Sequence, residues 1–82
     1  MKILPLHSEL EKYLAKRGLA KKFQKQAKLF EQDLFHKSLN TELLEPKYLR
    51  FWSFRVDKKF RAVFIFRNKE EVEIIDINNH YK

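Results

Sequence analysis

The chain has 82 residues, 44% of them hydrophobic, a length that suits one compact core and is too short for two. It contains no cysteine, which excludes disulfides, thiolate metal sites and thiol nucleophiles and is typical of a reducing compartment. Eighteen Lys and Arg against eleven Asp and Glu give a formal charge of +7, which attracts polyanions or an acidic protein. We expect a single domain over residues 1–82.

The N-terminal residues MKILPLHSEL lack the apolar run of a signal peptide, and no segment has the length and apolarity of a membrane span. We therefore expect a cytoplasmic protein with no membrane partner. A first helix is predicted from Glu9 to Arg17. Ser8 suits its N-cap, Glu11 completes a capping box, and Gly18 suits the left-handed residue that follows a helix.

Apolar residues then recur at spacings of three and four, which predicts a buried stripe on a second helix from Leu19 to Leu34. The stripe consists of Ala20, Phe23, Ala27, Phe30 and Leu34. The short connection through Gly18 predicts an antiparallel helical hairpin. From His36 to Tyr48 the periodicity is lost and Pro46 prevents a continuous helix, so we expect a loop with a short turn at NTELL.

The rest of the chain reads as strands. The stretches RFWSFRV, FRAVFIF and EVEIIDI are rich in aromatic and β-branched residues, and polar DKK and NKEE separate them. Such a pattern predicts an antiparallel meander, one face of which the helical hairpin must cover. The predicted class is therefore α+β.

The alternation of side chains decides how the first two of these strands pair. With the three-residue loop Asp57-Lys58-Lys59, Val56 faces Phe60 and Arg55 faces Arg61. This register gathers the large apolar side chains on one face, namely Trp52, Phe54, Val56, Phe60, Ala62, Phe64 and Phe66. A two-residue loop would divide them between both faces. Burial of one large apolar side chain is worth roughly 1.5–3 kcal/mol, so the three-residue loop should win.

The same register makes Arg55 and Arg61 cross-strand neighbours on the face away from the helices, beside Ser53 and Val63. Like charges directly opposite each other are destabilising. An anion between them would relieve the repulsion, and arginine forks suit phosphate oxygens. The alternative is that both long side chains extend into solvent.

The third strand does not alternate cleanly between apolar and polar residues. A bulge at Ile74-Ile75 would bring its four aliphatic residues to the core, namely Val72, Ile74, Ile75 and Ile77. Beyond the bulge, Asp76, Asn78 and His80 would then point to the arginine face.

The ordered stretches HKSL, FWSFRV, KKFRAVFIF and EIIDINNHYK, behind a basic helical hairpin, resemble the RelE/ParE superfamily of toxins from bacterial toxin–antitoxin pairs. The resemblance spans essentially the whole chain and is nearest to the YoeB-like and RelE-like messenger RNA endoribonucleases. It implies a RelE-like sheet of three or four strands, although Pro5 leaves little room for the family's usual first strand. It also implies a cognate antitoxin, the ribosome and mRNA as partners, and no metal or small-molecule cofactor.

The resemblance also assigns roles to individual residues. Arg61 matches the arginine that stabilises the scissile phosphate, and Arg55 matches an arginine on the preceding strand. His80 and Tyr81 match a C-terminal pair that handles acid chemistry and base stacking.

Two glutamates match the family's general base. Counting back ten residues from Trp52 without a gap selects Glu42, whereas an alignment with a gap selects Glu45. Such a base would remove the proton of the RNA 2′-hydroxyl, an acid such as His80 would protonate the departing 5′-oxygen, and cationic donors would stabilise the charge on phosphorus.

Lysines are the remaining candidates for contacts to RNA phosphates. They are Lys21, Lys22, Lys25 and Lys28 on the second helix, and Lys58 and Lys59 in the loop between strands. The alternative for the helical lysines is an ordinary solvated face. Two other functions stay open: a ParE-like toxin that inhibits DNA gyrase without cleaving RNA, and a small basic RNA-binding module. The pair FRAVF and NHYK favours the nuclease.

Overall fold

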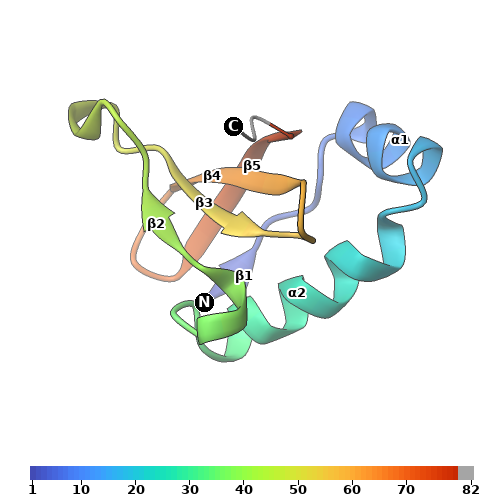
Figure 1. Ribbon diagram of the computed structural model, residues 1–82. Helices are drawn as coiled ribbons and strands as arrows, with labels where there is room; N and C mark the ends of the chain where they lie inside the picture. The colour runs from blue at the N-terminus through green and yellow to red at the C-terminus, as the bar shows by residue number, and fades with distance from the viewer. Residues whose placement is uncertain (80–82) are drawn as a thin grey trace.

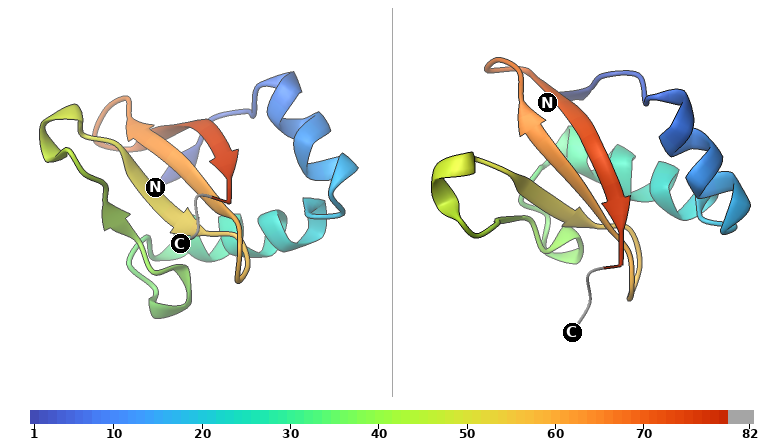
Figure 2. Two further views of the ribbon diagram at one scale, coloured as in Figure 1. Left: turned by 45° about the horizontal axis from the view of Figure 1, so that its top comes forward. Right: turned by 90° about the horizontal axis from the view of Figure 1, so that it is seen from above.

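In the computed structural model, which describes residues 1–79, both helices lie on the same side of a five-stranded sheet (Figures 1 and 2). The elements are β1 (Lys2–Ile3), α1 (Ser8–Lys16), α2 (Ala20–Gln32), the 3₁₀ turn η1 (Lys37–Leu39), β2 (Glu42–Leu43), the 3₁₀ turn η2 (Lys47–Leu49), β3 (Trp52–Arg55), β4 (Arg61–Phe66) and β5 (Glu71–Asn78). The predicted α+β class is confirmed. Among residues 1–79, no helix has the length and hydropathy needed to cross a membrane.

The sheet has the strand order β1-β5-β4-β3-β2, with β2 to β5 antiparallel and β1 parallel to β5. The expected count of three or four strands is therefore too low, because both edge strands are only two residues long. At the first edge, Lys2 N donates to Glu70 O at 2.7 Å and Leu4 N donates to Val72 O at 2.9 Å. Pro5 follows this pairing, so it does not prevent the first strand.

The second edge strand falls inside NTELL, where we expected only a turn. β2 pairs with β3, with Glu42 opposite Ser53 and Leu43 opposite Trp52. The preceding residue Thr41 is anchored by its hydroxyl, which donates to Leu34 O at 2.5 Å.

The helix boundaries follow the predicted signals except at the start of α1. Gly18 has φ +67 after α1, as expected for a left-handed residue. The predicted capping box is wrong, because the N-cap is His7 and no side-chain bond caps the helix. The His7 ring lies 2.6 Å from the Glu73 carboxylate on β5, and Ser8 is already the first residue of the helix.

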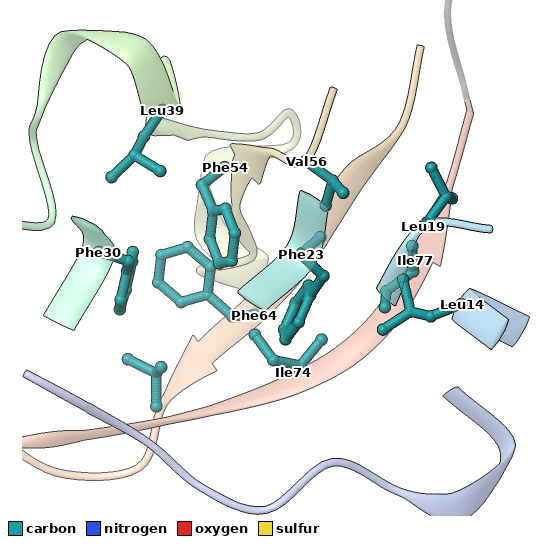
Figure 3. Packing of buried hydrophobic residues seen from close by; sticks show 12 residues of the cluster. Leu14, Leu19, Phe23, Phe30, Leu39, Phe54, Val56, Phe64, Ile74 and Ile77 are labelled. Atoms are coloured by element: carbon teal, nitrogen blue, oxygen red, sulfur yellow. The ribbon is translucent and has the colours of Figure 1, made fainter. Parts of the chain in front are cut away.

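The core lies between α2 and the middle of the sheet, where aromatic rings meet (Figure 3). Phe30 of α2 is fully buried, and its ring centroid lies 5.0 Å from those of both Phe54 and Phe64. Phe23 lies on the same face of α2, about two turns before Phe30, and its ring centroid is 6.1 Å from that of Phe54. The predicted stripe of α2 therefore faces the predicted apolar face of the strands.

The predicted register of β3 and β4 is confirmed, with Phe54 opposite Ala62 and Arg55 opposite Arg61. Phe66, the last residue of β4, lies on the predicted face with its ring against those of Trp52 and Phe64, but it remains 39% exposed. The predicted bulge on β5 is also present: Phe64 pairs with Ile74 and Val63 with Asp76, so Ile75 is the extra residue. Ile75 itself is only half-buried.

A buried amide connects the helical layer to the sheet. Gln26 Nε2 donates to Arg55 O at 2.8 Å and to Ser38 O at 3.3 Å. The pairing of β2 with β3 ends at Ser53, so β2 offers no hydrogen-bond partner to the Arg55 carbonyl. Gln26 supplies that hydrogen bond instead.

Replacing Gln26 should destabilise the protein more than replacing the exposed Gln24 on the same helix. We expect Gln26→Ala to lower the free energy of unfolding by about 1–3 kcal/mol, because it removes a buried hydrogen bond and leaves a carbonyl unpaired. Gln24→Ala, on the exposed side of the same helix, is the matched control and should change it by less than about 0.5 kcal/mol. Urea unfolding of both variants measures the difference, and equal values would contradict the role of Gln26.

The β3–β4 loop is closed by the carboxylate of Asp57. Its Oδ1 accepts from Lys59 N at 2.9 Å and from Phe60 N at 2.8 Å, and Lys22 Nζ lies 3.5 Å from Oδ2. Burial raises the pKa of Asp57, but the two backbone N–H bonds and the Lys22 charge outweigh it, so the pKa lies below its ordinary value.

This lowered pKa predicts how the stability gained from Asp57 depends on pH. The gain is complete above the ordinary pKa of aspartate, about 3.9, and is lost as the pH falls through the lower pKa of the folded state. We expect Asp57→Ala to be less stable than the parent by about 1 kcal/mol at pH 7. Urea titrations toward acid should show the gap closing below pH of about 4, and a gap that stays constant would contradict this account.

Candidate active site

The site residues lie on the face of the sheet that the helices leave open. Ser53 and Arg55 of β3 face away from the buried Phe54, and Arg61 and Val63 of β4 face away from the buried Ala62. Strand β2 adds Glu42 opposite Ser53, a neighbour that the strand pattern does not predict.

Strand β5 contributes to the same face beyond its bulge. Asn78 lies opposite Arg61 and Asp76 lies opposite Val63, as the predicted bulge requires. The Asp76 carboxylate accepts from Asn78 Nδ2 at 2.7 Å. His80 and Tyr81, which the resemblance places in the site, lie outside the described residues.

Arg61 is held from its inner side by a buried hydroxyl. Its Nε donates to Ser53 Oγ at 3.0 Å, and Ser53 has no exposed surface. Its Nη2 donates to the Glu42 carboxylate and to Asn40 O, the latter at 3.4 Å. The Arg61 side chain is 23% exposed and that of Glu42 is 49% exposed. One edge of the guanidinium is thus fixed below the surface, and its contact with Glu42 lies at the surface.

Glu42 also reduces the repulsion that is expected between Arg55 and Arg61, because its carboxylate contacts Arg61. Arg55 and Arg61 are cross-strand partners, but Arg61 has a carboxylate of the chain itself beside it, and the Arg55 side chain is exposed. The pair therefore does not require a bound anion to exist. Of the two alternatives, solvent exposure is seen for Arg55 only, and an anion bound between the two arginines stays a prediction.

These groups surround a hollow of about 330 Å³. It is lined by Glu42, Leu44, Glu45, Ser53, Arg61, Val63 and Asn78. Both glutamates that match the general base are therefore part of one site, and Glu42 is the one that contacts Arg61. Arg55 does not line the hollow.

The lysines that were predicted to contact RNA phosphates lie away from the hollow beside Arg61. The four helical lysines are exposed, and Lys21, Lys25 and Lys28 line a groove of about 620 Å³ along α2. Because α2 covers the opposite face of the sheet, the structure does not bring this stripe to the hollow (Figure 1). Lys58 and Lys59 are exposed in the β3–β4 loop, and Lys22 lies near that loop through its contact with Asp57.

Two features of the site were missed from the sequence. Ser53 was noted only as a neighbour of the arginines, although its isolated hydroxyl in an apolar strand was a usable signal. The Asn40 carbonyl depends on a left-handed backbone at φ +48, for which the sequence offers only the tolerance of asparagine for that region. Among residues 1–79, no three His, Asp or Glu side chains are grouped so that they could hold a metal ion.

Comparisons with known proteins bear on the fold. No family model matches the sequence, and no curated protein matches it. A YoeB/ParE toxin from Agrobacterium tumefaciens has a similar structure, with a TM-score of 0.72, 17% identity and coverage of 99% of this chain and 100% of that chain. YoeB–YefM toxin–antitoxin complexes from Staphylococcus aureus, one described as heterotetrameric, match at a TM-score of 0.69, 19% identity and coverage of 98% and 94%. The chain therefore has the fold of the YoeB/ParE toxins.

Proposed function

We propose that the chain is the toxin of a toxin–antitoxin pair and that it cleaves messenger RNA at the hollow beside Arg61. The observation that carries the proposal is the contact of Arg61 with both a buried hydroxyl and an exposed carboxylate on an open sheet face. The similarity of fold to the YoeB/ParE toxins supports the toxin role. The charge of +7 suits both an RNA substrate and an acidic antitoxin.

The strengths of the two Arg61 contacts suggest what happens when RNA binds. A hydrogen bond from a charged donor to a buried acceptor such as Ser53 Oγ is worth about 1.5–3 kcal/mol. An exposed ion pair such as Arg61 with Glu42 is worth roughly 0.2–1 kcal/mol. A phosphate oxygen can therefore replace Glu42 at Nη2 at small cost while Nε stays on Ser53.

The exchange supplies the groups that RNA cleavage needs. Glu42 takes the proton of the 2′-hydroxyl, whose oxygen attacks the adjacent phosphorus, and the bond from phosphorus to the 5′-oxygen breaks. Arg61 stabilises the negative charge that develops on the phosphate oxygens. The departing 5′-oxygen takes a proton from an acid, a role that the resemblance assigns to His80. The products are a 2′,3′-cyclic phosphate and a free 5′-hydroxyl.

A cognate antitoxin is the partner proposed for inhibition. The Staphylococcus aureus structures of the same fold are toxin–antitoxin complexes. An acidic segment of such a protein, bound over the open face, would meet the same guanidinium that the phosphate needs. The ribosome is the proposed place of cleavage, and the exposed lysines of α2 are the proposed contacts to its RNA phosphates.

Substitutions at the hollow test the chemistry. We expect Arg61→Ala to lower cleavage of mRNA on translating ribosomes by about 10²–10³-fold, because it removes the donor for the developing charge. Glu42→Gln should cause a loss of about 10²–10⁴-fold, because it keeps the shape but removes the base. Arg55→Ala should cost less than Arg61→Ala, and Arg55→Lys less than Arg55→Ala, since Arg55 is exposed and outside the hollow.

Arg17→Ala is the control, because Arg17 lies over the Tyr13 ring on the α1 side of the molecule. It should cleave like the parent. Mapped cuts that persist unchanged in Arg61→Ala and Glu42→Gln would refute the site. A parent protein that makes no cuts but traps DNA gyrase would instead assign the ParE-like function, and one that does neither but binds RNA would be a binding module.

A further inference from the structure

A short basic and aromatic segment lies next to the hollow and has no role in the proposed chemistry. It is Lys47–Phe51, with the sequence KYLRF, and we call it the KYLRF segment. Tyr48 is 81% exposed, Leu49 44% and Phe51 37%. Such side chains do not contribute their full burial energy to the fold, so the core does not explain why they stand here.

The segment forms the tip of the hairpin that carries the site. Its stems are β2 and β3, with Glu42 opposite Ser53, and Leu44 N donates to Phe51 O at 2.7 Å next to the tip. Figures 1 and 2 show this tip projecting from the body of the molecule between β2 and β3. The residues that hold Arg61 and the exposed rings are therefore parts of one element.

The tip has a defined backbone. Leu49 N donates to Pro46 O at 3.1 Å and Arg50 N donates to Lys47 O at 3.0 Å, which forms the turn η2. Arg50 then adopts φ +58, a left-handed conformation that is uncommon for a residue with a side chain and costs on the order of 1 kcal/mol. The rings of the segment are thus presented on a fixed turn.

A second hollow lies beside the segment, at the end of β4. It has a volume of about 420 Å³ and is lined by Leu49, Arg50, Phe51, Trp52, Ile65 and Phe66. On β4, Ile65 lines this hollow and Val63 lines the one beside Arg61. These alternate residues share the open face, so the surface from Arg61 to Ile65 extends along one strand for roughly 13 Å. An extended RNA strand covers that distance in a few nucleotides.

We propose that the KYLRF segment binds single-stranded RNA on one side of the phosphate held at Arg61. A base stacks on Tyr48 at the tip or enters the hollow at Phe51, and Lys47 and Arg50 contact the flanking phosphates. The inference rests on the proposed function, because it takes the RNA cleaved at Arg61 as the ligand. Lysine, which the segment contributes at Lys47, is depleted at protein interfaces, and the chain's charge of +7 attracts polyanions. This charge pattern favours RNA over a protein partner.

Binding of RNA can be measured apart from its cleavage in the Glu42→Gln background. The probe is a short fluorescein-labelled single-stranded RNA of mixed sequence, and fluorescence anisotropy gives the Kd. Tyr48→Ala should raise the Kd by about tenfold, the effect of losing one stacked base, and Tyr48→Phe should restore it because the ring remains. Because Tyr48 is 81% exposed, the thermal midpoint should not change.

Two further variants separate stacking from charge. Arg17→Gln is the matched control for charge, since Arg17 lies over the Tyr13 ring on the α1 side of the molecule, away from the segment (Figure 1). It should leave the Kd unchanged. Arg50→Gln should weaken binding to all sequences and reduce the slope of log Kd against log salt by about one.

The outcomes distinguish this inference from the proposed function. Parent-like binding by Tyr48→Ala would overturn the subsite even if wild-type protein cleaves mRNA. Tyr48-dependent binding by a protein whose wild-type form cleaves nothing would support the subsite and remove the chemistry. An absence of RNA binding by the parent, with Tyr48→Ala instead disrupting self-association in gel filtration, would assign the surface to protein contacts and overturn the proposal.

Discussion

Burial of the aromatic residues between α2 and the sheet is the constraint from which the rest of the structure follows. Phe54 and Phe64 are fully buried against Phe30, and a slip of one residue between β3 and β4 would turn their rings to solvent. At roughly 1.5–3 kcal/mol for each ring, that loss is too large for a chain of this size. The register that avoids it places Arg61 two residues from the Ser53–Val63 pair, on the same face of the sheet, and so the core determines the geometry of the site.

Where the sequence carries a strong local pattern, it predicted the structure correctly. The predictions failed where contacts between residues distant in the sequence determine the local structure. Alternation along β3 and β4 and the single glycine at Gly18 gave the register and the end of α1. β1 and β2 are two residues long, too short for any periodicity, and exist because a neighbouring strand offers them hydrogen bonds. The predicted cap at Ser8 failed because the helix begins one residue earlier, after His7, whose ring contacts Glu73, a residue 66 positions away.

The same distinction applies to the site. The position of Arg61 followed from the pattern of its own strand, and Glu42 was selected only through the resemblance to a family, because its strand carries no pattern. Its contact with Arg61 joins residues 19 positions apart and requires β2 to pair with β3. The role of Ser53 needed coordinates, since only a structure shows that a buried hydroxyl accepts from Nε. The contribution of His80 and Tyr81 remains a proposal from the resemblance.

The two basic regions of the molecule face different directions, which restricts how a polyanion can use them. The lysine groove runs along α2 on the covered side of the sheet, and Arg61, Glu42 and the KYLRF segment lie on the open side and at its edge. A short extended strand bound at the hollow does not also follow α2. If both regions bind RNA, the lysines therefore contact a second and bulkier surface, as the ribosome would provide, and salt should weaken that contact independently of the chemistry at Arg61. In this arrangement, the helical layer holds the large partner while the open face stays accessible to the strand that is cut.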